Sequence, residues 1–404
     1  MIRRQPAPFD ESAFEQSTFI RSTKQQIDRR APIDAWGAFC QLFVVALAGL
    51  SVLLSSKFRE LLDQKFTLDG DYIQALLAIP DASLNPDDPF RNTALIYRIL
   101  GLSDAPDVAA MLAIAAFGVA VLAAVRWNEM ARLTPLGLGI IAVCYVLALI
   151  YLSQYSKEFV SLLLVAAVLL LPRGAVAEFA LVGAMIGYAI TIRPYWGIVV
   201  ALYIAGRFLL PRVRGLFPVL LLVVATYVVL QVAFNVVLAQ DLSFSRVAVN
   251  DLRAQINVSV GSLIVDFLPD QVALQWLNAF LVLLSLIAPW PLILGGSSVY
   301  LLMGGVLAVL WGLVGWAILK LQRERAIARG RALQPARTAE LSERSPRPER
   351  ATALLLALVV VQAIFEPDYG SYLKHVVPML PLFLALLPLS TRASKSRITQ
   401  EESA

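Results

Sequence analysis

One short stretch, residues 365–381, concentrates the groups of this chain that suit acid–base chemistry or anion binding. It contains Glu366, Asp368, Lys374 and His375, the last being the only histidine among 404 residues. Strongly apolar segments flank the stretch on both sides. Charged side chains at the edge of a hydrocarbon layer are costly unless they face water, a partner or a substrate. The stretch therefore predicts a functional site at the end of a membrane helix.

The composition indicates a polytopic membrane protein. Hydrophobic residues make up 58% and charged residues 16% of the chain, and mean hydropathy is +0.71. The net charge of +5 is modest, and the arginines fall in short blocks between apolar runs, which is typical of membrane topology and excludes a nucleic-acid footprint. Cys40 and Cys144 lie inside apolar runs without a second ligand nearby, so neither a disulfide nor a metal site is indicated.

The elements that must position the chemical groups are spanning helices of about 20 mostly apolar residues. Ten segments of this kind are expected: 35–55, 108–125, 134–152, 159–172, 175–192, 195–210, 215–239, 299–319, 351–365 and 376–390. A further apolar piece at 276–288 is short and ends at Pro289-Trp290-Pro291. We expect a re-entrant or interfacial helix there, and an eleven-span alternative stays open. The predicted fold class is all-α, a polytopic transmembrane helix bundle of about ten spans plus this helix.

The positions of the basic residues predict the orientation. Cytoplasmic loops are rich in lysine and arginine, and the basic blocks near the span ends fall on one side if both termini are cytoplasmic. The expected location is a bacterial cytoplasmic (inner) membrane, with no cleavable signal peptide at the start. The expected organisation is a cytoplasmic tail at 1–34, a bundle at 35–390 with outer loops 56–107 and 240–298 and a cytoplasmic loop 320–350, and a second tail at 391–404.

This orientation brings four unusual segments to the outer face. They are the Asp-Gly-Asp-Tyr motif at 69–72, the loop 154–158, the corner 193–196 and the stretch 366–375. Basic residues on an outer face run against the usual bias, so they indicate an anionic ligand such as phosphate or pyrophosphate. The sequence therefore predicts one outer site assembled from distant parts of the chain.

The residue types suggest two kinds of role in this site. A positioned carboxylate or histidine can accept a proton from an attacking hydroxyl. The catalytic candidates are Asp69, Asp71, Glu158, Glu366 and His375. Basic groups bind phosphate, and aromatic rings with polar rims, Tyr155 and Trp196 included, suit sugar rings. The substrate-binding candidates are Lys157, Arg193, Tyr195, Asp368, Tyr369, Tyr372 and Lys374.

Each of these features also has a plain structural interpretation that stays open from the sequence. The alternatives are a tight turn at 69–71, a local Lys157–Glu158 ion pair capping a helix, a snorkelling Arg193, an interfacial aromatic belt, a structural His375 and a helix-ending turn at 366–368.

Taken together, the motifs resemble bacterial Wzy-like polysaccharide polymerases, which are related in architecture to the C-superfamily of lipid-dependent glycosyltransferases. The motifs that carry the resemblance are Asp-Gly-Asp-Tyr at 69–72, Ser-Lys-Glu at 156–158, Arg-Pro at 193–194, Trp-Pro at 290–291 and Asp-Tyr-Gly-Ser-Tyr-Leu-Lys-His-x-x-Pro at 368–378. The chain departs from many O-antigen polymerases and ligases in lacking one very long, Arg-rich outer loop.

The resemblance implies a membrane glycosyltransferase of surface polysaccharide or exopolysaccharide biosynthesis that acts on undecaprenyl-pyrophosphate-linked sugars. Lys157, Arg193 and Lys374 then bind the donor pyrophosphate, while His375 and one acid among Asp69, Asp71, Glu158 and Glu366 activate the acceptor. No cofactor is implied, except a divalent cation in a single-sugar variant. The implied partners are polyprenyl-linked glycans, membrane lipids and export or chain-length proteins. A single-sugar transferase, a flippase or transporter, and a non-catalytic scaffold are the alternatives.

Overall fold

The computed structural model describes residues 35–79, 85, 88–255, 263–264, 266–269, 271–295, 298–331 and 347–388. Within these ranges the fold is all-α, with 16 helices and no strand. The expected cytoplasmic tails at 1–34 and 391–404 lie outside the described residues, as does the part of the expected cytoplasmic loop at 332–346.

Six helices are long and apolar enough to cross a membrane, which makes the chain a multi-pass membrane protein. They are α2 (Ala35–Phe58), α5 (Pro106–Val125), α6 (Pro135–Leu152), α10 (Leu216–Ala233), α14 (Ser298–Arg331) and α16 (Arg347–Phe365). Local sequence explains their bounds. At the start of α6, for example, the Thr134 side chain accepts a hydrogen bond from the Gly137 N–H, and Pro135 occupies the first turn.

Four further apolar helices are shorter than the expected spans. They are α7 (Glu158–Leu170), α8 (Ala175–Thr191), α9 (Trp196–Leu209) and α12 (Gln275–Ile287). With its 13 residues, α7 extends about 20 Å at a rise of about 1.5 Å per residue, against a hydrocarbon core about 30 Å thick. Length alone therefore supports six of the expected spans.

The expected helix at 376–390 is interrupted, and the prediction of one continuous helix there is wrong. The chain instead forms α17 (Tyr369–Val376), a single 3-10 turn at Val377–Met379 and the short α18 (Leu380–Leu384). Pro378 and Pro381 lie at the first positions of the last two elements. Each proline lacks a backbone donor, so a regular helix cannot run through both.

The expected outer loop 56–107 is largely helical. It contains α3 (Gln64–Leu77) and α4 (Pro89–Ile99). The Asp88 side chain begins α4 by accepting hydrogen bonds from two backbone N–H groups, each 3.0 Å long. The turn proposed for 69–71 is wrong, because these residues lie within α3. The remaining helices are α11 (Phe244–Gln255) and α13 (Trp290–Leu294).

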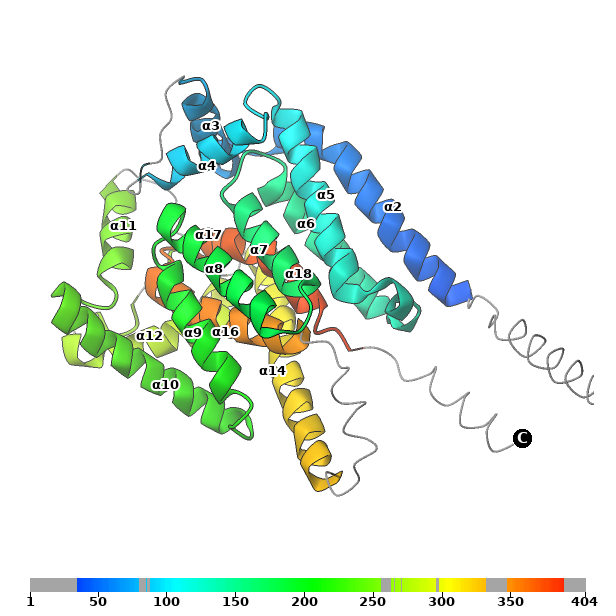
Figure 1. The fold of residues 1–404 in the computed structure, drawn as a ribbon. Helices are drawn as coiled ribbons and strands as arrows, with labels where there is room; N and C mark the ends of the chain where they lie inside the picture. The colour runs from blue at the N-terminus through cyan, green and yellow to red at the C-terminus, as the bar shows by residue number, and fades with distance from the viewer. Residues whose placement is uncertain are drawn as a thin grey trace, which may run out of the picture.

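Helix α16 forms the centre of the bundle. In the most apolar 18-residue part of each helix, 78% of the residues are buried in α16 and 22% in α2. It packs against α7, α9, α12 and α14, whereas α2 lies at the edge against α5 and α6 (Figure 1). The exposed apolar surface of α2 is the kind that a membrane helix presents to lipid. The two ends of α16 therefore mark the two ends of the core.

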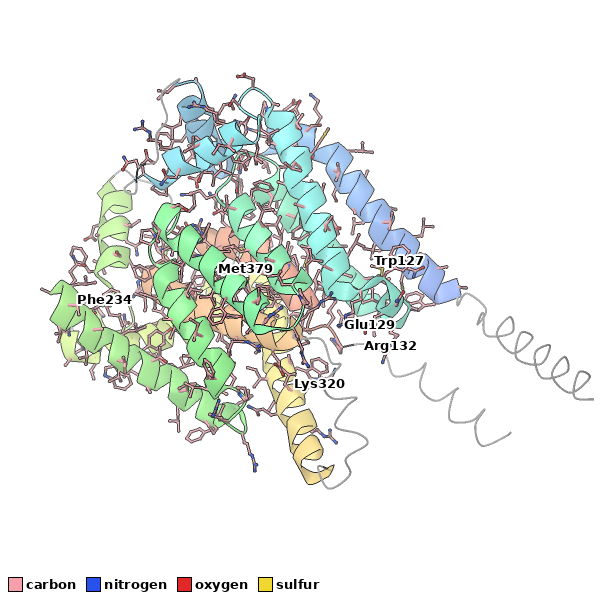
Figure 2. All side chains as sticks on the ribbon, viewed as in Figure 1. Trp127, Glu129, Arg132, Phe234, Lys320 and Met379 are labelled. Carbon is pink, nitrogen blue, oxygen red and sulfur yellow. The ribbon has the colours of Figure 1, made fainter. Side chains whose placement is uncertain are left out.

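The N-terminal end of α16 is fixed by a buried network of charges. Arg350 is fully buried and donates to Glu178 over 2.8 Å and to the carbonyl oxygens of Leu171 and Pro172 over 2.6 and 2.9 Å. Arg207 of α9 also pairs with Glu178. Figure 2 shows Glu129, Arg132 and Lys320 at the end of the bundle away from α3 and α4. The Arg350 network joins α8, α9 and α16, and the opposite end of α16 leads to the candidate site.

Candidate functional site

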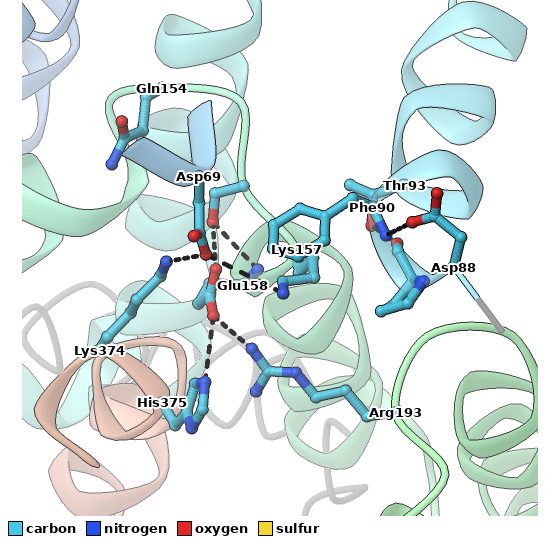
Figure 3. Close-up of polar contacts among 12 residues, drawn as sticks. Asp69, Asp88, Phe90, Thr93, Gln154, Lys157, Glu158, Arg193, Lys374 and His375 are labelled. Carbon is cyan, nitrogen blue, oxygen red and sulfur yellow. Dashed lines mark hydrogen bonds and ion pairs between the residues drawn. The ribbon is translucent and has the colours of Figure 1, made fainter. Parts of the chain in front are cut away.

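Charged and titratable side chains from distant parts of the chain meet beyond the C-terminal end of α16 (Figure 3). We call this group the ionic cluster. Its members are Asp69 of α3, Lys157 and Glu158 at the start of α7, Arg193 between α8 and α9, Glu366 after α16, and Lys374 and His375 of α17.

The buried base of the ionic cluster is the pair formed by Glu158 and Arg193. The Arg193 Nη2 lies 2.5 Å from Glu158 Oε1, and the two side chains are 8% and 0% exposed. The second carboxylate oxygen accepts a hydrogen bond of 2.8 Å from Ser156 Oγ, and Arg193 Nη1 donates to the Tyr195 hydroxyl over 3.2 Å. Arg193 therefore does not snorkel to the surface. Glu158 pairs across the bundle with Arg193 rather than locally with Lys157.

Sequence around residue 156 explains the position of Glu158. The Ser156 Oγ also accepts a hydrogen bond of 3.0 Å from the Glu158 backbone N–H, where α7 begins. An acid in the first turn of a helix is stabilised by the helix dipole. The start of α7 therefore holds the Glu158 carboxylate in place for Arg193.

His375 lies between two carboxylates. Its Nδ1 contacts Glu366 Oε1, and its Nε2 lies 3.6 Å from Glu158 Oε1. Asp368 positions the helix that carries His375, since its side chain accepts hydrogen bonds of 2.8 Å from both the N–H and the Oγ of Ser371. Asp368 therefore acts as the N-cap of α17, so it begins a helix. The carboxylate on Nδ1 favours one orientation of the imidazole ring.

The more accessible part of the ionic cluster is a carboxylate shared by two ammonium groups. Lys374 Nζ hydrogen-bonds to Asp69 Oδ2, and Lys157 Nζ lies 3.9 Å from the same oxygen. Figure 3 shows Asp69 between the two lysines. The side chains of Lys157, Lys374 and Asp69 are 13%, 17% and 32% exposed. Lys157 Nζ also lies 3.5 Å from the centroid of the Phe90 ring of α4, a cation–π contact.

Lys157 loses its charge at a lower pH than an ordinary lysine does. Burial, and then repulsion by the nearby Arg193, lower the pKa of Lys157 from 10.5 to about 8. A negatively charged ligand at this position favours the ammonium form. Lys157 therefore keeps its proton in most molecules at neutral pH and loses it as pH rises past about 8.

The basic and acidic side chains of the ionic cluster balance one another. Its three basic side chains match its three carboxylates, so the cluster has no net formal charge while His375 is neutral. Arg193 is committed to the buried Glu158. The two lysines share only Asp69, so an anion that displaces this carboxylate contacts both ammonium groups.

Asp71 lies outside the ionic cluster. It pairs with Arg59, accepts a hydrogen bond of 3.0 Å from Thr67 Oγ1, and is 45% exposed. Asp71 points to a different side of α3 from Asp69, so the structure separates the two catalytic candidates of the Asp-Gly-Asp-Tyr motif.

The candidate aromatic residues lie within the bundle rather than in an exposed belt. Tyr155, Trp196, Tyr369 and Tyr372 are each at most 2% exposed. The Tyr372 hydroxyl accepts a hydrogen bond of 2.6 Å from Trp311 Nε1, which assigns it to packing between α14 and α17. Among the aromatic candidates, Tyr195 contacts the ionic cluster directly, through Arg193, and its ring stacks on Phe365 at 5.4 Å between centroids.

Sequence reasoning missed a second buried arginine that supports the site. Arg246 of α11 is 1% exposed, donates to the Ala363 carbonyl oxygen over 2.6 Å and pairs with Asp266. Asn278 donates to the same Asp266 over 2.6 Å. The Ile264 N–H also donates to the Pro367 carbonyl oxygen over 2.9 Å. Arg246 and Ile264, in a region expected as an outer loop, therefore hold the chain on both sides of Glu366.

Comparisons with known proteins add no assignment, since no family model, curated protein or solved structure matches the chain. Among the described residues, no group of three or more histidine, cysteine, aspartate or glutamate side chains is arranged to hold a metal ion. The described geometry places two lysines on the partly exposed Asp69 carboxylate, and an imidazole between Glu158 and Glu366.

Proposed function

We propose that the protein is a membrane glycosyltransferase that polymerises or transfers polyprenyl-(pyro)phosphate-linked sugars during surface polysaccharide biosynthesis. The observation that carries the proposal is the pair of lysines, Lys157 and Lys374, that converge on Asp69 beside the buried Arg193. The six long apolar helices support it, because the polyprenyl chain of such a substrate lies in the membrane.

Donor binding follows from the charges of the ionic cluster. The pyrophosphate of the donor takes the place of Asp69 between Lys157 and Lys374, which bind it as point charges. Arg193 stays with Glu158 and adds a fixed positive charge in a water-poor region, where preorganised charges stabilise a leaving group strongly. Binding therefore releases the Asp69 carboxylate from its lysine partners.

The chemical step is a substitution at the anomeric carbon of the donor sugar. The oxygen of an acceptor hydroxyl forms the new bond to this carbon, while the bond from the carbon to the phosphate oxygen breaks and its electron pair leaves with the polyprenyl pyrophosphate. The released Asp69 or His375 accepts the hydroxyl proton. A positioned general base contributes about 10²–10⁴-fold to such a reaction.

The proposed sidedness places the ionic cluster on the outer face of the bacterial cytoplasmic membrane, in a bundle of about ten spans with cytoplasmic termini. The opposite end of the bundle supports this orientation, since it carries Arg132 and Lys320 (Figure 2) and Arg207, which pairs with Glu349 at the start of α16. Basic residues of this kind are typical of cytoplasmic loops.

The centre of the bundle favours catalysis at one end over transport. Residues 353–361 of α16 are all apolar and separate the ionic cluster from the Arg350 network. A flippase or transporter requires polar groups near the membrane midplane on interrupted helices. We therefore assign the ionic cluster to binding and chemistry at a single face.

Analysis of lipid-linked glycans in a deletion strain tests the proposal. Accumulation of complete single repeat units, reversed by the wild-type chain and not by the Lys157→Ala/Lys374→Ala variant, is the result expected for a polymerase. A repeat unit that lacks one sugar identifies a single-sugar transferase. An unchanged glycan pool, with polymer still made, contradicts the proposal.

A further inference from the structure

Three aromatic side chains form a continuous row between the ionic cluster and the exposed surface of α10. Tyr195 precedes α9, Phe365 ends α16, and Phe234 begins the π-helical turn Phe234–Leu238 that follows α10. The Tyr195 and Phe365 rings stack with their centroids 5.4 Å apart, and the Phe365 and Phe234 centroids are 6.2 Å apart. Each of the three side chains is only partly buried. We call them the aromatic row.

The inner end of the aromatic row contacts the ionic cluster. The Tyr195 hydroxyl accepts a hydrogen bond of 3.2 Å from Arg193 Nη1. Phe365 directly precedes Glu366, whose carboxylate contacts the His375 ring. The row therefore borders charged groups of the cluster through two of its three members.

The other end of the aromatic row lies on a surface that faces lipid. In the most apolar 18-residue part of α10, 17% of the residues are buried, the lowest value among the six long helices of the described residues. Exposed valines flank Phe234, since Val232, Val236 and Val237 are 57%, 78% and 77% exposed. Figure 2 places Phe234 at the edge of the bundle that α10 forms. Phe234 is therefore next to the lipid of the bilayer.

The length of α10 places Phe234 near the boundary of the hydrocarbon layer. The 18 residues of α10 extend about 27 Å at a rise of about 1.5 Å per residue, in a layer about 30 Å thick. The chain then widens into the π-helical turn, an irregularity that is frequent at functional sites. In this turn Phe234 packs against Phe365, whereas Val236 and Val237 stay exposed. The end of α10 therefore presents one ring to the row at the depth where a lipid head group meets its chain.

This arrangement fits the chemistry of an amphiphile with an anionic head and a long apolar chain. The two lysines of the ionic cluster suit the head, and the aromatic row offers apolar ring faces beside the cluster. A soluble sugar nucleotide has no apolar chain to place against rings at a lipid-facing surface. The flat alkene units of an isoprenoid chain pack on aromatic faces, and this packing removes apolar surface from water at the edge of the bilayer.

We propose that the aromatic row binds the isoprene units nearest the pyrophosphate of the donor, and that the donor reaches the ionic cluster laterally, from the bilayer past Phe234. This inference rests on the proposed function and deepens it, since it assigns a position to the polyprenyl chain. The chain leaves the pyrophosphate towards α10, so the donor sugar on the opposite phosphate points away from α10.

Two ligands separate the aromatic row from the ionic cluster in the full-length protein held in phospholipid nanodiscs. Undecaprenyl pyrophosphate carries both the chain and the head, whereas inorganic pyrophosphate carries the head alone. Phe234→Ala and Phe365→Ala should each weaken binding of undecaprenyl pyrophosphate about tenfold and leave binding of inorganic pyrophosphate within about twofold of wild type. The matched control is Phe217→Ala, which removes a 69% exposed ring near the other end of α10 and should change neither affinity.

Photocrosslinking tests the same contact in the wild-type protein, where no variant has to fold. Undecaprenyl pyrophosphate with a diazirine on the isoprene unit next to the pyrophosphate should label residues of the aromatic row, and excess undecaprenyl pyrophosphate should prevent the labelling. Labelling confined to residues outside the row overturns the assignment. Labelling that the excess ligand does not prevent also overturns it, because it marks contact with ordinary lipid.

The outcomes of the binding experiment distinguish this inference from the function beneath it. Equal affinity of wild type and all three variants for undecaprenyl pyrophosphate overturns the aromatic row as a chain site. A parallel loss of inorganic pyrophosphate binding in Phe234→Ala and Phe365→Ala overturns it too, because the rings then only support the charged groups. A wild-type protein that binds neither ligand overturns the proposed function instead. Thermal unfolding in the same nanodiscs identifies any variant that misfolds.

Discussion

Lys374 donates a hydrogen bond to the carboxylate of Asp69, a residue that lies 305 positions earlier in the chain. This contact joins α17 to α3 and gives Asp69 two ammonium neighbours, because Lys157 approaches the same oxygen. The Lys374 and Asp69 side chains are 17% and 32% exposed, so the pair is partly buried and still reaches the surface of the bundle. The proposed mechanism depends on exchange of this carboxylate for the donor pyrophosphate.

Replacing Asp69 separates binding from chemistry. Asp69→Asn removes the charge that competes with a bound pyrophosphate, and it also removes the proposed base. We expect undecaprenyl pyrophosphate to bind at least as tightly as in wild type, while turnover of lipid-linked repeat units falls by about 10²–10⁴-fold. The matched control is Asp71→Asn, two residues away and paired with Arg59, which should retain turnover within a few-fold. Equal losses in both variants would exclude Asp69 as the base.

Binding of the lipid pyrophosphate should weaken as pH rises. The pKa of Lys157 in the ligand-free protein is about 8, so its ammonium group loses its proton as pH passes that value. Calorimetric titration of undecaprenyl pyrophosphate at a series of pH values measures the effect. Lys157→Arg keeps its charge throughout and should show a flatter profile than wild type. Identical profiles for the two proteins would mean that Lys157 does not contact the anion.

The same shift predicts how stability depends on pH. The pKa of Lys157 is lowered from 10.5 in the unfolded chain to about 8 in the folded protein, so the folded state binds fewer protons between these values. The free energy of unfolding should therefore increase as pH rises from about 8 towards 10.5. The free energy of unfolding is measured in detergent across this range for wild type and for Lys157→Met, and the difference between them isolates the contribution of Lys157. A difference that falls as pH rises would contradict the lowered pKa of Lys157.

The Glu158–Arg193 pair should behave as a single buried unit. Arg193→Ala leaves a carboxylate that is 0% exposed without its guanidinium partner, which typically costs about 3–5 kcal/mol. The double variant Glu158→Gln/Arg193→Met removes both charges and should recover much of the lost thermal stability. It should not recover transfer activity, because the fixed positive charge beside the leaving group is absent. Glu158→Gln and Arg193→Met are also measured singly. If their two losses of stability add up to the loss in the double variant, the coupling is disproved.

Arg246 should act as a positioning residue. Arg246→Met removes the contacts that attach α11 to Ala363 and Asp266. We expect faster proteolysis of the segment 244–278 and a fall in turnover, with binding of undecaprenyl pyrophosphate unchanged because the lysines keep their positions. Arg246→Lys should partly restore resistance to protease. If lipid binding falls as much as turnover, Arg246 supports the whole site rather than the stretch around Glu366.

Hydropathy and the alternation of basic and apolar segments were sufficient to predict the main helices and the meeting of distant residues. Lys157 and Arg193 lie in the connections before α7 and α9, whereas Asp69 lies within α3 and Lys374 within α17, and the structure brings all four together. The pairing within the cluster depends on tertiary distances of a few ångströms, which no spacing in the sequence encodes.

The errors have physical causes that are visible at particular residues. Asp69 and Asp71 are typical of turns, but packing of Gly70 on Gln154 stabilises a helix there. Pro378 and Pro381 interrupt the expected last helix, and the high hydropathy around them gives no sign of this interruption. Arg246 lies in a segment of mixed polarity, and its partners are contributed by residues far away in sequence.

The most direct test of the ionic cluster as a lipid-pyrophosphate site is the affinity of the purified full-length protein for undecaprenyl pyrophosphate in nanodiscs. Lys157→Ala/Lys374→Ala is compared with wild type and with Lys57→Ala, whose lysine pairs with Glu60 and is 72% exposed. We predict a loss of at least tenfold in the double variant, about 1.4 kcal/mol or more, and an unchanged affinity in the control. Equal affinity in all three proteins would contradict the account.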